Sequence, residues 1–328
     1  MISINSLFKN HRPIIRKLWA LMELVDEDGP DIPRQRQKLR RELLLLTMPT
    51  PRHFISLDDY DINAVSEGLF SLDHGGLRFD CLLHRHDSAG SPLFVILSGL
   101  RNPDKHPVPK FDRLSFAPLF PGHVLYVSDP VHHHPQAKLL RTGWYLGDER
   151  QPGIPALAEL VQYIRIELGA ARYPLVCYGS SAGGFAAACL ASELAEAVAV
   201  AINPQTRLWH FGGLFTAWLR TCYPSLNPQT IVKQGHHLFD LHSRLQKPGV
   251  RLLYVQNQLD KLHFQRYYQP FCQEFGFNAL SDGLNRQGNL ATYLYQDPAG
   301  HGGEPRSLAP ELIAIALQMA EGSKTIAA

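Results

Sequence analysis

The chain has 328 residues, of which 45% are hydrophobic and 19% are charged, and its formal net charge at pH 7 is +2. That length and composition are typical of a globular protein with a sizeable core, in one large domain or two small ones. Because charges of both signs are spread along the chain, the charge pattern gives no support for nucleic acid or strongly acidic molecules as partners, and no nucleic acid partner is expected. No stretch reaches the roughly 18 apolar residues of a membrane span.

The cysteines and the N-terminal residues indicate in which cellular compartment the protein is expected. The five cysteines are an odd, scattered set without a C-x-x-C pair, a usage that suits a reducing environment. Residues 1–25 contain neither the uninterrupted apolar segment nor the small-residue cleavage site of a signal peptide. We therefore expect a cytoplasmic protein.

Residues 1–52 are predicted to form a helical extension in front of the main domain. An amphipathic helix is expected over 12–29, and a second over 33–51, which begins at a proline and is stopped by two more. The basic run 34–41 is interpreted as a solvated helix face, with a surface for an acidic partner as the alternative. If the chain forms a homo-oligomer or binds a protein partner, we expect it to do so through these helices.

Residues 53–328 are predicted to form an α/β domain. Strand-like and helix-like segments alternate from about residue 65, which is typical of a mostly parallel sheet with helices on both faces and an antiparallel hairpin at its start. Residues 205–246, rich in aromatic residues, histidine and proline, interrupt the alternation and are expected to form a cap insertion. The predicted strands are 67–86 (a hairpin), 92–100, 123–131, a run from 175, 197–204, 250–258 and 290–297, and the predicted helices are 154–169, an alanine-rich segment from 185, one near 262–275, and 307–320.

A serine stands where the strand beginning at residue 175 must turn into a helix. The stretch 179–183, GSSAG, matches G-x-S-x-G with Ser181 at its centre. In that pattern the glycines leave space at a tight corner, and the strained turn lifts the serine hydroxyl to a helix N-terminus, where N–H groups favour a developing anion. Ser180 lacks flanking glycines and is interpreted as a turn residue. Ser181 is therefore the predicted nucleophile.

A serine hydroxyl needs a base, and the base needs an orienting acid. His301 lies in the loop after the last predicted strand, and Asp260 lies just past the carboxyl end of the preceding one. With Ser181 they fall at one edge of the sheet, in the chain order nucleophile, acid, base. The open alternatives are that Asp260 only caps a helix, that His301 is an ordinary loop residue, and that Asp297 is the orienting acid.

An acyl-transfer site also needs donors for the oxyanion that forms on the carbonyl oxygen. The N–H of Ala182, directly after the nucleophile, is the expected first donor. The second is expected from the loop after the strand 92–100, where Gly99 permits an outward-facing N–H at Leu100 or Arg101. A plain turn glycine is the alternative interpretation of Gly99.

Two further features have simpler interpretations. His132, His133 and His134 stand in a row near Asp129, but adjacent histidines on an extended segment point to opposite sides, so no metal site is predicted there. The aromatic residues of 205–246 are interpreted as packing the cap onto the body, with a platform for an acyl chain or a sugar as the alternative. Neither G-x-x-x-x-G-K-[ST] nor G-x-G-x-x-G occurs, so nucleotide chemistry has no support.

The segment YGSSAGG around Ser181, together with Asp260 and His301, resembles the triad of the α/β-hydrolase family over roughly residues 65–322. The resemblance implies an α/β-hydrolase-type sheet, a serine nucleophile that forms an acyl-enzyme, and neither a metal nor an organic cofactor. The oxyanion loop reads LSGLRN instead of a His-Gly-Gly type, and the N-terminal extension has no counterpart in the minimal fold. The segments NPQT and GWYLGD (203–206 and 143–148) resemble hydrolase-like proteins of bacterial surface-polysaccharide synthesis, some of which transfer acetyl groups to sugars.

These observations favour a serine ester hydrolase that acts on a small-molecule or glycan ester through Ser181, His301 and Asp260. The first alternative is an O-acyltransferase that uses the same residues, with a sugar hydroxyl in place of water. The second alternative is a non-catalytic, hydrolase-like protein that binds a partner through its N-terminal helices.

Overall fold

The structure, a computed structural model, describes residues 52–60, 68–88, 90–106, 108–136 and 140–321. The chain divides into two units, Met1–Pro51 and Arg52–Ala328. The predicted N-terminal helices, and the partner surface assigned to them, therefore lie outside the described residues. None of the helices in those residues combines the length and the hydrophobicity that a membrane span requires.

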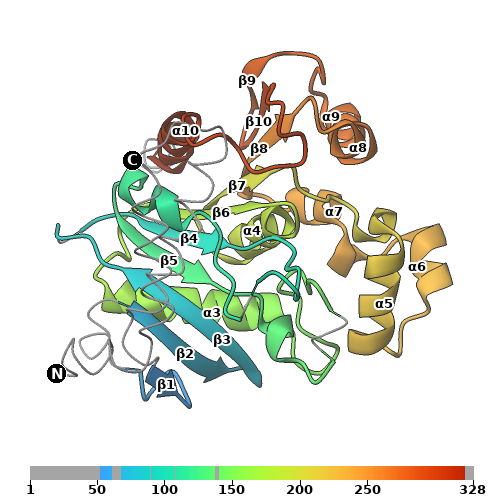
Figure 1. Ribbon diagram of the computed structural model, residues 1–328. Coiled ribbons are helices and arrows are strands. Elements are labelled where there is room, and N and C mark those ends of the chain that lie inside the picture. Colours follow the sequence, from blue (N-terminus) through green and yellow to red (C-terminus); the bar gives the residue numbers. More distant parts are fainter. Residues whose placement is uncertain (1–51, 61–67, 89, 107, 137–139, 322–328) are drawn as a thin grey trace, which may run out of the picture. The chain divides into compact units, whose positions relative to one another are not determined.

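In the described part of the second unit, ten strands form one sheet in the order β1-β2-β3-β5-β4-β6-β7-β8-β10-β9 (Figure 1). Strands β5, β4, β6, β7, β8 and β10 are parallel, whereas the pairs β2–β3, β3–β5 and β9–β10 are antiparallel. The predicted mostly parallel sheet with a hairpin at its start is thus confirmed. The strands are β1 (Arg52–Phe54), β2 (Gly68–His74), β3 (Leu77–His84), β4 (Leu93–Leu97), β5 (His123–Val127), β6 (Leu175–Ser180), β7 (Val198–Ile202), β8 (Arg251–Asn257), β9 (Gly283–Gln287) and β10 (Leu290–Tyr295).

Helices cover the sheet on both faces. Successive side chains of a strand point to opposite sides, so a strand such as β4, which is buried at every position, needs a cover on each face. Leu93, Val95 and Leu97 of β4 belong to a core cluster that includes residues of α3, α4 and α9. On the opposite face Phe94 packs against Phe120, and α10 contacts β6 and β7, so that Figure 1 shows β4 and β6 between α10 and α3. The helices are α3 (Gly153–Glu167), α4 (Ala182–Glu193), α5 (Gly213–Cys222), α6 (Pro228–Gln234), α7 (Leu241–Leu245), α8 (Lys261–His263), α9 (Gln269–Phe275) and α10 (Ala309–Glu321), with shorter turns η2 (Leu114–Leu119), η3 (Pro130–His133), η4 (Leu208–Phe211), η5 (His237–Phe239) and η6 (Phe264–Tyr268).

Some boundaries differ from the predicted ones. Strand β5 ends at Val127, four residues before the predicted end, because Asp129 caps the short turn η3 that begins at Pro130. The edge strand β9 was not predicted at all. Its sequence, GLNRQ, is polar and largely exposed, so it carries no apolar run that marks a strand.

The close packing of α4 against the sheet depends on two glycines. A Cβ atom on Gly183 would lie 2.3 Å from the carbonyl oxygen of Leu97 on β4, and a Cβ atom on Gly179 would lie 2.3 Å from the carbonyl oxygen of Gly183. No larger residue fits at either position without a backbone shift. Glycine at both positions therefore lets the first turn of α4 lie directly on β4. This close approach sets the position of Ser181, which stands between the two glycines in the sequence.

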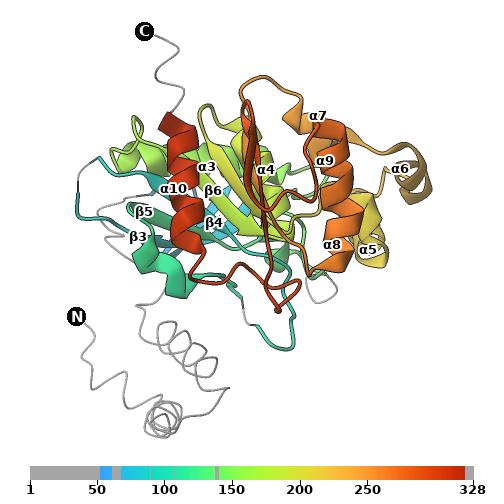
Figure 2. The ribbon, with the colours of Figure 1, turned by 90° about the horizontal axis from the view of Figure 1, so that it is seen from above.

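The predicted cap insertion, 205–246, contains η4, α5, α6, η5 and α7 between β7 and β8. Figures 1 and 2 show α5 and α6 beside the sheet. Phe215, Trp218 and Tyr223 are buried, and Trp218 packs against Trp144 from the body of the domain. These three aromatic residues therefore attach the insertion to the body, whereas Trp209 is only partly buried.

Candidate active site

Ser181 occupies the corner between β6 and α4, with φ 54° and ψ −119°. A residue other than glycine at positive φ is strained and persists only where its surroundings hold it. The N–H of Ser181 donates to the carbonyl oxygen of Ile202 at 2.8 Å, and its own carbonyl accepts from the N–H of Gly184 and of Phe185. Ser180 is the last residue of β6 and not a turn residue. The corner places the Ser181 hydroxyl at the carboxyl ends of the parallel strands.

Ser181, His301 and Asp260 form a continuous chain of polar contacts. Ser181 Oγ lies 3.1 Å from His301 Nε2, and His301 Nδ1 lies 2.5 Å from Asp260 Oδ2. The structure thus brings together three residues that are separated in the sequence, from the loops after β6, β8 and β10. Asp297, the alternative acid, instead accepts a hydrogen bond from the N–H of Ala299 in its own loop.

Buried amide side chains hold the loop that carries His301. Asn257, the last residue of β8, donates from Nδ2 to the carbonyl oxygen of Gly300 at 2.8 Å, and Asn203 donates to that of Gly302 at 3.0 Å. Asn203 and Asn257 are both fully buried. The backbone is therefore fixed on both sides of His301, although its own side chain is 43% exposed.

A second histidine shares the carboxylate of Asp260. His263 Nδ1 lies 3.1 Å from Asp260 Oδ2, and its ring stacks on that of His301, with the centroids 3.9 Å apart and 15° between the planes. Asp260 also caps the helix, because Oδ1 accepts from the N–H of His263 at 3.2 Å. Asp260 is thus both a helix cap and the partner of His301. No role is predicted for His263 from the sequence alone. Its position three residues after Asp260, within the helix that Asp260 caps, is the sequence feature that indicates a contact between the two.

The two histidines determine the protonation of Asp260. Burial by itself would raise the pKa of this carboxyl group, but hydrogen bonds from His263 and His301, and the charge of either ring when protonated, lower the pKa well below its usual value. Burial, in turn, lowers the pKa of His263. At neutral pH the site therefore contains an ionised Asp260 beside a neutral His263.

The same residues are the candidate metal ligands. Among the described residues, the group of potential ligands close enough to hold an ion is Asp260, His263 and His301, whose ligand atoms lie within 4.8 Å of one another. An ion bound there would occupy the carboxylate and the imidazole that face Ser181, so it would replace the polar chain described above. The consecutive histidines diverge instead: His133 Nε2 contacts Asp80 at 2.6 Å, and His132 Nδ1 contacts Ser128 at 3.2 Å.

Gln205 connects Ser181 to the rest of the site. Its Nε2 donates to Ser181 Oγ at 2.8 Å and lies 3.1 Å from His263 Nε2, while its Oε1 accepts from Trp144 Nε1 at 3.2 Å. Gln205 is fully buried. The segments NPQT and GWYLGD thus meet at the serine. Both segments are noted in the sequence analysis, but no role is predicted there for Gln205.

Gly99 lies directly beside the predicted nucleophile. A Cβ atom at this position would lie 3.8 Å from Ser181 Cβ and 3.2 Å from the carbonyl oxygen of Ser180. The N–H of Gly99 is already used, because it donates to Asp112 Oδ2 at 2.9 Å. Gly99 therefore shapes the loop next to Ser181 but does not offer its own N–H.

The remaining amides of the predicted oxyanion site differ in availability. The N–H of Arg101 donates to the carbonyl oxygen of Arg141 at 2.8 Å. Across the part of the chain that the structure describes, the N–H groups of Leu100 and Ala182 donate to no protein acceptor. Ala182 is the first residue of α4, where an N–H has no partner within the helix. The two free N–H groups closest in sequence to Gly99 and Ser181 are therefore those of Leu100 and Ala182.

A polar pocket of about 680 Å³ lies in the cap insertion. Its lining includes Trp209, His210 and Arg207, two residues after Gln205, together with residues of α6 and α7. Ser181 and His301 are not among the lining residues. The pocket is therefore lined by the cap insertion and not by the serine and the histidine of the polar chain.

No family model and no curated protein matches the sequence, but solved structures match the fold. An S-formylglutathione hydrolase from Agrobacterium tumefaciens is 16% identical, with a TM-score of 0.54, over 78% of this chain and 94% of that one. An acetyl xylan esterase from Paenibacillus sp. R4 is 15% identical, with a TM-score of 0.50, over 73% and 80%. A chain of the Glycosylation Associate Protein (Gap123) complex from Streptococcus agalactiae is 14% identical, with a TM-score of 0.51, over 74% of this chain but only 44% of that one. This chain shares their fold.

Proposed function

We propose that this chain, whose fold is of the α/β-hydrolase type, is a serine enzyme that hydrolyses carboxylic esters through an acyl-enzyme. The observation that carries the proposal is the polar chain from Ser181 through His301 to Asp260, at a serine held at φ 54°. The fold by itself is no evidence of activity, because one fold serves many functions. A nucleophile, a base and an orienting carboxylate within hydrogen-bond reach are what acyl transfer requires.

In the proposed reaction Ser181 Oγ attacks the ester carbonyl carbon while its proton passes to His301 Nε2. Asp260 stabilises the imidazolium, and the oxyanion accepts hydrogen bonds from the N–H groups of Ala182 and Leu100. When the tetrahedral intermediate collapses, the alcohol leaves with the proton from Nε2 and the acyl group remains on Ser181. Water then gives a proton to Nε2 and attacks the acyl carbon, and the second collapse releases the acid and restores Ser181.

The test is covalent labelling of the purified protein with a fluorophosphonate, with the labelled peptide located by mass spectrometry. We expect the label on Ser181, and we expect labelling to slow by at least about 100-fold in His301→Ala because the base is lost. Ser180→Ala, which removes the neighbouring hydroxyl, is the matched control and should label like the parent. Hydrolysis of p-nitrophenyl acetate at the parental rate by Ser181→Ala would show that the proposal is wrong.

A second candidate is the transfer of the acyl group to a sugar hydroxyl. Its support is the contact of Gln205 with both Ser181 and Trp144, because the two segments that resemble proteins of polysaccharide synthesis meet there. The polar pocket of the cap insertion has the partly buried Trp209 in its lining, and an aromatic ring can supply an apolar surface for a sugar. Hydrolysis and transfer differ in whether the acceptor excludes water from the acyl-enzyme.

Incubation with an acetyl donor and a panel of oligosaccharides separates the two candidates. Transfer predicts sugars that are heavier by one acetyl group, formed by the parent and not by Ser181→Ala. If a protein whose Ser181 is labelled by fluorophosphonate releases free acetate and modifies no sugar, the result supports the hydrolase and contradicts the transferase.

A further inference from the structure

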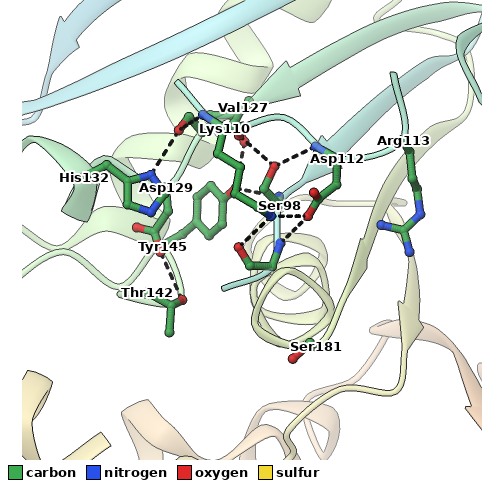
Figure 3. A network of polar contacts seen from close by, with 12 residues as sticks. Ser98, Lys110, Asp112, Arg113, Val127, Asp129, His132, Thr142, Tyr145 and Ser181 are labelled. Atoms are coloured by element: carbon green, nitrogen blue, oxygen red, sulfur yellow. Dashed lines mark hydrogen bonds and ion pairs between the residues drawn. The ribbon is translucent and has the colours of Figure 1, made fainter. Parts of the chain in front are cut away.

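An ion pair between a buried lysine and a half-buried aspartate holds the loop next to the serine. Lys110 Nζ lies 2.5 Å from Asp112 Oδ2, and the side chains of Lys110 and Asp112 are 5% and 27% exposed. Both side chains bind Gly99: Asp112 Oδ2 accepts from its N–H at 2.9 Å, and Lys110 Nζ donates to its carbonyl oxygen at 3.1 Å. Figure 3 shows the side chains of Lys110 and Asp112 converging on the segment that carries Ser98. Gly99 is thus held on both of its peptide groups.

Ser98 fixes the same loop through three further hydrogen bonds. Its N–H donates to the hydroxyl of Tyr145 at 2.7 Å, its Oγ donates to the carbonyl oxygen of Lys110 at 2.9 Å, and the same Oγ accepts from the N–H of Asp112 at 3.1 Å. Tyr145 is fully buried, and its hydroxyl donates to the carbonyl oxygen of Val127 at 2.7 Å. The loop at 98–99 and the segment 110–112 are therefore tied together at several points (Figure 3).

The carboxyl group of Asp112 favours its ionised form. Burial by itself would raise the pKa of Asp112, but the Lys110 ammonium, the Arg113 guanidinium and the N–H of Gly99 lower it below its usual value. A lysine buried in an ion pair often adds no stability over an apolar residue of similar volume, because its ammonium loses its hydration. Stability is therefore a weak explanation for an ammonium that faces a backbone carbonyl beside the serine.

The geometry of the peptide group connects this ion pair to the oxyanion site. The carbonyl of Gly99 and the N–H of Leu100 belong to one planar trans peptide, in which the two groups point in opposite directions. Because Lys110 Nζ lies on the carbonyl side, the N–H of Leu100 faces away from it. A Cβ atom added to Gly99 would lie 3.8 Å from Ser181 Cβ, and among the described residues the Leu100 N–H donates to no protein acceptor.

We propose that Lys110, held by Asp112, is a positioning residue that orients the Gly99–Leu100 peptide so that the Leu100 N–H donates to the oxyanion. The ammonium also polarises this peptide through its carbonyl oxygen, which makes the N–H a stronger donor when the oxyanion forms. This inference rests on the proposed serine mechanism. It adds that the oxyanion site is set by a buried charge that touches neither substrate nor nucleophile.

The test compares ester hydrolysis by the parent and by Lys110→Met. Loss of one oxyanion donor lowers kcat by about 100- to 1,000-fold, so a donor that is only misaligned should lower it by about 10- to 100-fold. We expect KM to change by less than about threefold, because the ester is bound before the oxyanion forms. A trifluoromethyl ketone, which forms a tetrahedral oxyanion on Ser181, should bind more weakly by about the same factor as the loss of kcat/KM. Lys105→Met, in the same loop but exposed, is the control and should match the parent.

A second variant covers the possibility that Lys110→Met does not fold, since that change leaves the Asp112 carboxylate without its ammonium. Lys110→Met/Asp112→Asn removes both charges and keeps an acceptor for the Gly99 N–H, and we expect the same loss of kcat from it. A parental kcat and a parental affinity for the trifluoromethyl ketone in either folded variant would overturn the inference while labelling of Ser181 remains. Failure of the parent itself to label at Ser181 would overturn the proposed function instead.

Discussion

At the scale of single residues, Ser181 has two side-chain partners with different chemistry. His301 Nε2 can accept the serine proton, whereas the amide nitrogen of Gln205 can only donate, and it does so to Ser181 Oγ at 2.8 Å. A donor on one side of Oγ favours the rotamer in which the hydroxyl proton faces the histidine. Gln205 is itself held by the indole N–H of Trp144. The nucleophile is therefore oriented by a residue outside the predicted triad.

Replacement of Gln205 tests this role. Gln205→Met keeps the approximate volume but removes the donor to Ser181, so we expect kcat to fall about tenfold, the equivalent of one hydrogen bond of about 1.4 kcal/mol. KM for a small ester should change little. The indole N–H of Trp144 loses its acceptor, so the free energy of unfolding should fall by about 1–3 kcal/mol. Steady-state kinetics and urea unfolding measure the two effects.

The control for Gln205 is Gln273→Met, the same exchange at an exposed position of α9. It should leave both kcat and stability at parental values. A Gln205→Met protein that is destabilised but retains the parental kcat would show that Gln205 only fills space next to Ser181.

At the scale of elements, the junction of β4, β6 and α4 decides where the serine lies. The glycines of G-x-S-x-G act at different contacts here: Gly179 makes room for the backbone of α4, and Gly183 makes room for the backbone of β4. The motif thus describes an approach between a helix and two strands, and not only a tight turn. The position of Ala182, whose N–H is a proposed oxyanion donor, depends on the same approach.

Gly183→Ala is expected to disturb this junction. The added Cβ would lie 2.3 Å from the carbonyl oxygen of Leu97 and 2.8 Å from its carbonyl carbon, so the backbone of α4 or β4 must move. Overpacking of this kind costs about 1–3 kcal/mol of stability, and the displaced N-terminus of α4 should also lower kcat. Urea unfolding and ester kinetics of the same preparation check both effects.

Gly213→Ala, at the first position of α5, is the matched control, because a Cβ atom there meets nothing within 4 Å. It should be as stable as the parent or slightly more stable, since alanine is the better helix former. Equal stability of Gly183→Ala and Gly213→Ala would contradict the close packing of α4 on β4.

At the scale of the whole described domain, buried histidines make stability depend on pH. His123, His132, His242 and His263 are all buried, and burial is the largest cause that lowers the pKa of each. The carboxyl groups of Asp80, Asp112 and Asp260 also have lowered pKa values, so they stay ionised until the pH is well into the acid range. Between neutral pH and pH 5 the histidines therefore dominate.

The sign of the effect follows from the unfolded state. An unfolded histidine binds its proton near pH 6.5, whereas these folded histidines bind it only at lower pH, so protons favour the unfolded chain. The stability that these neutral histidines contribute is complete above about pH 6.5, and it is lost as the pH falls through their pKa values in the folded protein. We expect Tm to fall by several degrees between pH 7.5 and pH 5, in low and in high salt alike because the groups are buried. A Tm that is constant or rises over this interval would contradict the expectation.

The parts of this protein that the sequence determined by itself are those that depend on neighbouring residues. Runs such as Leu93–Leu97 and Leu175–Tyr178 are apolar enough to be buried on both faces, so their strands, the parallel sheet and the G-x-S-x-G corner could be predicted from local pattern alone. Ser181, Asp260 and His301 could be proposed because parallel strands end at one edge. Strand β9 could not be predicted, because an exposed polar edge has no such pattern.

Only the tertiary structure decided which side chains meet at that edge. Gln205 contacts His263, 58 positions later in the chain, and Gly99 is bound by Lys110 and Asp112 from the far end of the long connection between β4 and η2. Such contacts leave no periodic signal, because they depend on where the packed elements place the ends of several loops and not on the residues beside them. Hydrophobic periodicity therefore specifies the frame of the site, whereas the orientation of its donors and acceptors is set by long-range packing.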